Sequence, residues 1–196
     1  MTPKNLELYT IGHSNQTMDD FLRLLKENYI HILADVRSQP YSRFNPQFNR
    51  DSLKYALAQA TIDYVFAGEY LGGRPTDPTC YKNGAVPEGK ADYLKLVDYG
   101  EVRKRDWYLR GIDRLLQIVG ERLTAIMCSE EDPMQCHRHH LITQTLLERG
   151  VTVWHIRANG KIEEAKPLPE KIVAWQPPLL FLRTKQLESI VWLLLT

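Results

Sequence analysis

The sequence predicts an α/β protein, a three-layer sandwich with a mainly parallel sheet of about five strands. Two observations lead to this prediction. Short apolar runs alternate along the chain with longer runs whose apolar residues repeat at helical spacing. Most of the apolar runs also end in polar or glycine-containing loops, which suits parallel strands joined by crossover helices. The expected strands are Leu6 to Ile11, Ile30 to Val36, Ile62 to Phe66, Leu123 to Met127 and Val151 to Ile156.

The first half of the chain alternates strand and helix regularly. Thr17 suits the N-cap of a helix over residues 18–28, whose apolar positions repeat at helical spacing. The strand, helix, strand order implies a right-handed crossover between parallel strands. Residues 38–49 contain prolines, asparagines and aromatics without periodicity, which indicates an ordered loop. A second helix is expected over residues 51–59.

The second half contains a long excursion before its helices. Leu-Gly-Gly at 71–73 marks a sharp turn, and the proline- and glycine-rich segment 76–89 suggests a lid. Gly150 suits the left-handed conformation that ends a helix. The expected helices of this half cover residues 91–99, 102–119 and 139–149.

Composition is that of an ordinary globular protein. The chain has 196 residues, of which 43% are hydrophobic and 25% charged. This length favours one α/β domain over residues 1–157, followed by an irregular tail and a C-terminal docking helix over residues 158–196. The net charge of +1 gives no general attraction to nucleic acid. A local basic patch stays open, with Arg37, Arg43, Arg50 and Arg74 as its candidates.

Cysteine content and hydropathy indicate a cytoplasmic protein. The cysteines are Cys80, Cys128 and Cys136, an odd and sparse set, and no apolar secretion signal begins the chain. The apolar stretch 179–195 is interrupted by charged residues, so it lacks the run of about 20 apolar residues that spans a bilayer. We expect no membrane association. This stretch would instead cover its own domain or a second subunit of a homo-oligomer.

Six short motifs follow one another along the chain. They are Tyr-Thr-Ile-Gly-His-Ser at 9–14, Asp-Val-Arg at 35–37, Pro40 with Ser42-Arg43, Leu-Gly-Gly at 71–73, Met-Cys-x-Glu at 127–130 and Cys-His-Arg at 136–138. With these motifs, the chain closely resembles the prokaryotic family filed as domain of unknown function 488 (DUF488) over about residues 8–156. The resemblance implies a compact α/β fold and a shared site rather than a particular reaction.

Polar residues follow three of the predicted strands, at 13–14, 35–37 and 128–130, and a helix begins near Cys136. If the strands are parallel neighbours, these groups meet at one edge of the sheet, where a helix N-terminus adds free N–H groups. A phosphate or carboxylate ligand suits this combination of polar side chains and free backbone N–H groups. The catalytic candidates are Asp35, Glu130, His13 and His137. The ligand-binding candidates are Ser14, Arg37, Tyr41, Ser42, Arg43, Cys128, Cys136 and Arg138.

These residues also have structural interpretations. His13 would then cap a turn, and Asp35 would hold backbone N–H groups of the loop. Arg37 or Arg43 would form a buried ion pair with Glu130 instead of clamping a ligand. We do not expect Asp35 and Arg37 to face each other directly, because side chains alternate along an extended segment.

The cysteines allow several roles. Cys136 at a helix N-terminus is expected to have a favoured thiolate, whereas Cys128 directly after a strand is typical of a small buried side chain. With His137 the two cysteines offer soft metal ligands, but the seven residues between them exceed the spacing of a compact zinc knuckle. The sequence therefore assigns no metal and no cofactor. The outline of strand, Cys128, loop, Arg138 and helix is similar to rhodaneses and cysteine phosphatases, whose loop is tighter.

Three functions stay open. The leading hypothesis is an enzyme that binds a phosphorylated ligand, a nucleotide or a nucleic-acid end, at the sheet edge. The second is a non-catalytic nucleic-acid-binding module, in which aromatic and arginine residues of the loop 37–50 stack on bases and contact phosphates. The same aromatics would otherwise pin the loop to the core. The third is a thiol or metal protein in which Cys128 and Cys136 do the chemistry.

Overall fold

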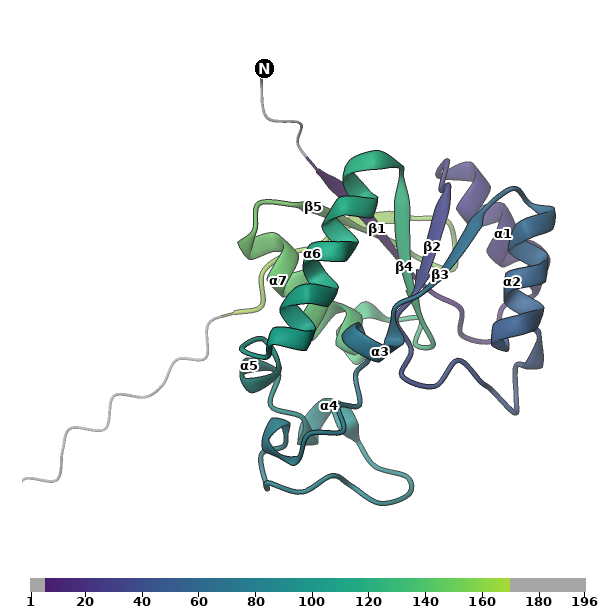
Figure 1. Ribbon diagram of the computed structural model, residues 1–196. Helices are drawn as coiled ribbons and strands as arrows, with labels where there is room; N and C mark the ends of the chain where they lie inside the picture. Colours follow the sequence, from purple (N-terminus) through teal and green to yellow (C-terminus); the bar gives the residue numbers. More distant parts are fainter. Residues whose placement is uncertain (1–5, 170–196) are drawn as a thin grey trace, which may run out of the picture.

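A six-stranded sheet with the order β3-β2-β4-β1-β5-β6 forms the centre of the protein in the computed structural model, which describes residues 6–169 (Figure 1). The strands are β1 (Glu7–Gly12), β2 (Ile32–Asp35), β3 (Asp63–Phe66), β4 (Thr124–Cys128), β5 (Thr152–Ile156) and β6 (Ile162–Glu164). β1 to β5 are parallel, and β6 is antiparallel to β5. The predicted three-layer α/β sandwich is confirmed, with six strands instead of about five.

Helices cover both faces of the sheet (Figure 1). α1 (Met18–Glu27) and α2 (Arg50–Gln59) pack on one face, where their apolar residues form one core with Leu33 and Met127. Thr17 caps α1 as predicted, because its hydroxyl accepts the N–H of Asp20 at 3.1 Å. The first crossover helix is therefore positioned by its cap and by its apolar stripe.

The opposite face is covered by α6 (Asp106–Glu121) and by a helical segment composed of the π-helical turn η4 (Arg138–Thr143) and α7 (Gln144–Glu148). Their buried residues form the second core with Ala34, Val36 and Ile126 of the central strands. Every residue of β2 and β4 is buried. Side chains alternate along these strands, so Met127 belongs to the first core and Cys128 to the second.

The predicted helix over residues 91–99 is wrong in extent. Two single-turn helices are present, α4 (Tyr93–Leu96) and α5 (Tyr99–Val102), and Val97 between them is extended. The break arises because the carboxylate of Asp98 accepts the N–H groups of Gly100 and Glu101, which starts a new helix. These turns belong to the excursion between α3 (Gly68–Leu71) and α6.

Residues 158–178 were expected to be irregular, but β6 lies among them and extends the sheet. A tight turn joins it to β5, with the N–H of Arg157 donating to the carbonyl of Lys161 at 2.9 Å. Gly160 in this turn is left-handed, with φ of 84°. Asn159-Gly160 is a hairpin signal that the prolines after it obscured. The sheet therefore continues beyond residue 157.

A buried hydrogen-bonded chain connects β1, β5, η4 and the segment after β6. The two ring nitrogens of His155 contact Thr10 Oγ1 at 2.7 Å and His139 Nδ1 at 3.0 Å. Nε2 of His139 accepts from the amide of Gln144 at 3.3 Å. This donor fixes both tautomers, because His139 must then donate to His155 and His155 to Thr10. Gln144 also accepts the N–H of Leu168 at 2.8 Å, so its amide anchors the tail.

Within residues 6–169, no helix is long and apolar enough to cross a membrane. The docking helix predicted over residues 179–195 lies outside the described residues. The homo-oligomer predicted from this segment therefore stays a prediction.

Candidate functional site

A cleft of about 280 Å³ opens beyond the carboxyl ends of β2 and β4. Four segments form its walls: residues 37–41 after β2, residues 73–74, residues 91–99 of the excursion, and residues 128–137 between β4 and η4. Ligands of open α/β sheets bind at this edge, where the loops diverge. The cleft is therefore the candidate ligand-binding site.

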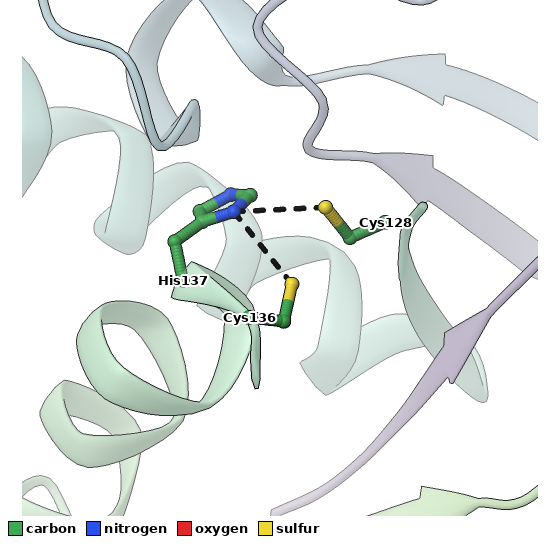
Figure 2. A group of neighbouring side chains, drawn as sticks. All are labelled: Cys128, Cys136 and His137. Carbon is green, nitrogen blue, oxygen red and sulfur yellow. Dashed lines mark hydrogen bonds between the residues drawn. The ribbon is translucent and has the colours of Figure 1, made fainter. Parts of the chain in front are cut away.

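The side chains of Cys128, Cys136 and His137 point toward one another (Figure 2), and all three residues line the cleft. The two sulfurs and one ring nitrogen all lie within 4.8 Å of one another. Nδ1 of His137 is 3.6 Å from Sγ of Cys128 and 3.8 Å from Sγ of Cys136. All three residues are buried. Cys128 is the last residue of β4, and the 3-10 turn η3 (Pro133–Gln135) returns the chain so that Cys136 approaches it.

Two contacts fix the ring of His137. Its Nε2–H donates to the backbone carbonyl of Val36 at 3.1 Å, which leaves the Nδ1 lone pair facing the two sulfurs. Gly73 packs directly on the ring, and a Cβ at this position would lie 2.6 Å from Cγ of His137. The second glycine of the Leu-Gly-Gly motif is therefore required by close approach of the backbone to an imidazole.

Glu130 lies beside the cluster in the same cleft, and its Oε2 accepts from Sγ of Cys128 at 3.1 Å. Burial raises the pKa of this carboxyl, and the Cys136 thiol raises it further. The backbone of the loop is held by Arg138, whose guanidinium donates to the carbonyls of Glu130 and Glu131. The backbone of Gly12 packs directly against this loop. A side chain does not fit at this position, because a Cβ there would lie 1.7 Å from the carbonyl oxygen of Glu130.

The two thiols differ in acidity. Burial opposes ionisation of both, but hydrogen bonding from Cys128 and the neighbouring His137 brings the pKa of Cys136 well below its usual value. The N–H of Arg138 also donates to Cys136 Sγ at 3.4 Å. The pKa of Cys128 is raised well above its usual value, since it shares a hydrogen bond with Cys136 and is buried. One thiolate is therefore favoured in the pair.

Asp35 and Arg37 form a buried bidentate ion pair, so the expectation that they do not face each other is wrong. Arg37 Nε and Nη2 donate to the carboxylate of Asp35 at 2.9 and 2.6 Å. The side chains of residues two apart on an extended segment point to the same side, which is the reason for the contact. Tyr64 donates to the same carboxylate at 2.9 Å. Arg37 therefore pairs with Asp35 and not with Glu130.

His13 belongs to this second group. Its Nε2 accepts from Arg37 at 3.3 Å, its Nδ1–H donates to the carbonyl of Ser14 at 2.8 Å, and its ring stacks on Phe48. Burial lowers the pKa of His13 to about 4, so the ring is neutral at pH 7. His13 and Asp35 lie on the α1/α2 side of the sheet, whereas Cys128 and His137 lie on the α6/α7 side. Neither His13 nor Asp35 lines the cleft.

The sequence profile of the family described as "Domain of unknown function DUF488" matches residues 17–144, more than half of the chain. The chain belongs to the DUF488 family. The resemblance predicted from the motifs is confirmed, and the matched range includes the cluster and Glu130. No curated protein and no solved structure matches the chain.

The remaining ligand-binding candidates of this DUF488 protein are divided between the cleft and its surroundings. Tyr41 lines the cleft and is 72% exposed. Ser42 builds a turn, because its hydroxyl accepts the N–H of Asn45 at 3.0 Å. Arg43 is exposed beside it. Ser14 is left-handed, with φ of 47°, and its N–H donates to the carbonyl of Ser129 at 2.8 Å.

Sequence reasoning named Arg74 only as part of a basic patch, and it missed Tyr93 and Tyr99, which also line the cleft of this DUF488 protein. The guanidinium of Arg74 stacks on the ring of Tyr93, 4.6 Å from its centroid, and no carboxylate within residues 6–169 pairs with it. Tyr99 also lines the cleft, and its pKa is raised by burial and by Cys136. Arg74 follows the Leu-Gly-Gly motif, which was a usable signal. The two tyrosines had none, because only the tertiary fold brings the excursion to the sheet edge.

Proposed function

We propose that this protein is a zinc-dependent hydrolytic enzyme whose metal is held by Cys128, Cys136 and His137, and whose cleft binds a phosphorylated ligand. One observation carries the proposal. Around a tetrahedral zinc with Zn–S of about 2.3 Å and Zn–N of about 2.05 Å, a sulfur and a nitrogen ligand are separated by about 3.6 Å. The two S···N distances in the cluster are 3.6 and 3.8 Å.

The surroundings support a metal as well. A metal-bound histidine commonly donates its second ring N–H to a backbone carbonyl, as His137 does to Val36. A divalent cation would stabilise the Cys136 thiolate and would offset the cost of ionising the buried Cys128 as a second ligand. Zinc is the metal that this mixture of thiolates and imidazole suits best.

The open side of the cluster favours a catalytic site over a structural one. Structural zinc sites have four protein ligands, whereas catalytic sites have three and leave one position for water. All three ligands here line the cleft, and so does the carboxylate of Glu130. A zinc ion in this place supplies an activated water molecule. Glu130 would accept the proton of this water.

Arg74 supports the phosphorylated ligand. The guanidiniums of Arg37 and Arg138 are already bonded to Asp35 and to loop carbonyls, so they have little to offer a ligand. Arg74 lines the same cleft without a carboxylate partner in the described chain. An arginine without an internal carboxylate partner suits a phosphate, which it binds through two parallel hydrogen bonds.

Metal analysis of untagged full-length protein tests the proposal. We expect bound zinc after purification, and Co²⁺ exchange that gives thiolate charge-transfer and tetrahedral d–d bands. Cys136→Ser and His137→Gln should lose most of the metal. Cys80→Ala is the matched control, because Cys80 is a buried cysteine outside the cluster. Folded protein that takes up no metal from excess Zn²⁺, with a reactive Cys136 thiol instead, would exclude a zinc enzyme in favour of thiolate chemistry.

A second candidate is the nucleic-acid-binding module, and the exposed aromatics beside the cleft favour it. Tyr41 is 72% exposed and Phe44 is 86% exposed, with the exposed Arg43 between them, so these rings do not pin the loop to the core. Phe48 does that instead. Single-strand binding that weakens with salt and is lost in a Tyr41→Ser/Phe44→Ser variant is the expected outcome. Unchanged binding in that variant would exclude this surface.

A further inference from the structure

We infer that the reaction of this site is hydrolytic deamination of an amino-substituted heteroaromatic ring, of the kind found in nucleobases, carried on a phosphorylated ligand. The inference rests on the proposed function, because it needs the metal held by the cluster. It goes further in naming the bond that is broken and the substrate class.

The combination of metal ligands and carboxylate points to this chemistry. Zinc enzymes that deaminate nucleobases hold the metal with one histidine and two cysteines, and use a glutamate that is not a ligand as the acid and base. Here the ligands are one histidine and two cysteines, and Glu130 follows the ligand Cys128 by two residues. Its Oε2 lies 3.1 Å from Sγ of Cys128. Glu130 therefore lies beside the residues that would hold the metal.

The walls of the cleft suit a flat ring with polar edges. Tyr41, which is 72% exposed, lines it and offers an aromatic face for stacking. The side-chain amides of Gln39 and Gln135 also line it, and neither amide hydrogen bonds to any group in residues 6–169. Such amides pair with the alternating donors and acceptors along the edge of a base. A volume of about 280 Å³ suits a small molecule better than a polymer.

The proposed step balances without an oxidant or a reductant. Water adds to the ring carbon that bears the amino group, forming a carbon–oxygen bond, while Glu130 takes a water proton and delivers it to the adjacent ring nitrogen. The carbon–nitrogen bond to the amino group then breaks. Glu130 transfers the hydroxyl proton to the leaving group, which departs as ammonia, and the ring keeps a carbonyl.

Arg74 gives the substrate its second recognition point. Its guanidinium stacks on Tyr93 in the wall of the cleft that also contains the cluster. A phosphate attached to the sugar of a base would pair with this charge. We therefore expect nucleoside monophosphates to be better substrates than the corresponding nucleosides.

The test uses full-length zinc-loaded protein and measures ammonia released from CMP, dCMP, AMP, dAMP and GMP, each compared with its nucleoside. We expect turnover of at least one nucleotide and a loss of about 100-fold or more in Glu130→Gln with the zinc retained. Arg74→Ala should raise KM for the nucleotide and leave KM for the nucleoside unchanged. Arg114→Ala is the matched control, because Arg114 on α6 is exposed and lies outside the cleft lining.

The outcomes separate the two proposals. Bound zinc with no ammonia from any of these compounds, and no change in the Co²⁺ spectrum when they are added, overturns deamination and leaves the zinc site standing. Absence of zinc overturns both. Ammonia release that is unchanged in Glu130→Gln overturns the role of that carboxylate and with it the inference.

Discussion

Acidification is expected to destabilise this protein through the buried His155. This residue of β5 hydrogen bonds to Thr10 of β1 and to His139 of η4. Burial, together with the neighbouring His139, lowers the pKa of His155 from 6.5 to about 3. The charges of Arg138 and Arg157 act in the same direction, and Glu163 opposes them. The folded protein thus resists protonation at a position where the unfolded chain accepts it.

The sign and size follow from linkage. A histidine whose pKa is lowered by folding contributes stability above pH 6.5, and loses it as the pH falls toward its folded pKa of about 3. Between pH 7 and pH 5 the unfolded chain takes up most of a proton at His155 and the folded chain almost none. This difference costs about 2 kcal/mol of unfolding free energy. His139, whose pKa is lowered to about 4, adds to the loss.

Urea unfolding of the wild type and of His155→Asn at pH 7, 6 and 5 measures the effect. Asparagine keeps an N–H for Thr10 but does not titrate, and the comparison cancels the groups common to both proteins, including His137, whose raised pKa acts in the opposite direction. We expect the stability advantage of the wild type to shrink by about 2 kcal/mol from pH 7 to pH 5. Parallel pH profiles for the two proteins would refute the reasoning.

Two further predictions concern the packing of Gly73 on His137 and the ion pair of Asp35 with Arg37. Gly73→Ala should displace the ring of His137 and weaken zinc binding by about 10-fold in a competition titration, with Gly120→Ala, whose Cβ meets open space, as the control that leaves affinity unchanged. Asp35→Asn should remove the charge that pairs with the buried Arg37 and lower the unfolding free energy by about 3 kcal/mol in urea; a change below about 1 kcal/mol would contradict the buried ion pair.

The parallel strands could be predicted from sequence because the sheet is covered on both sides, which makes each strand a short apolar run. β6 was missed because it is an edge strand of alternating, partly exposed residues. The helix expected over residues 91–99 failed where Asp98 began a new turn, since a cap inside an amphipathic pattern is easily read as part of it.

The sequence allowed us to predict at which edge of the sheet the site residues lie, but not on which face of the sheet each side chain lies. The strand order places the polar residues after β1, β2 and β4 at one edge, as expected. Alternation along the strands then directs Asp35 and Cys128 to opposite faces, which the motifs alone do not reveal. The approach of Cys136 to Cys128 depends on how the loop folds back, and the spacing of the two cysteines carries no sign of it.

Arg138 holds two successive loop carbonyls, and this contact affects how the proposed zinc ion would bind. A zinc finger is unfolded until the ion arrives, because nothing else stabilises its loops. Here Arg138, a residue that is 1% exposed, braces the loop from inside the protein, so we expect the three ligands to be gathered before any cation binds. Chelation should consequently yield an intact apoprotein that reloads quickly, and the binding energy remains for affinity instead of being consumed in ordering the polypeptide.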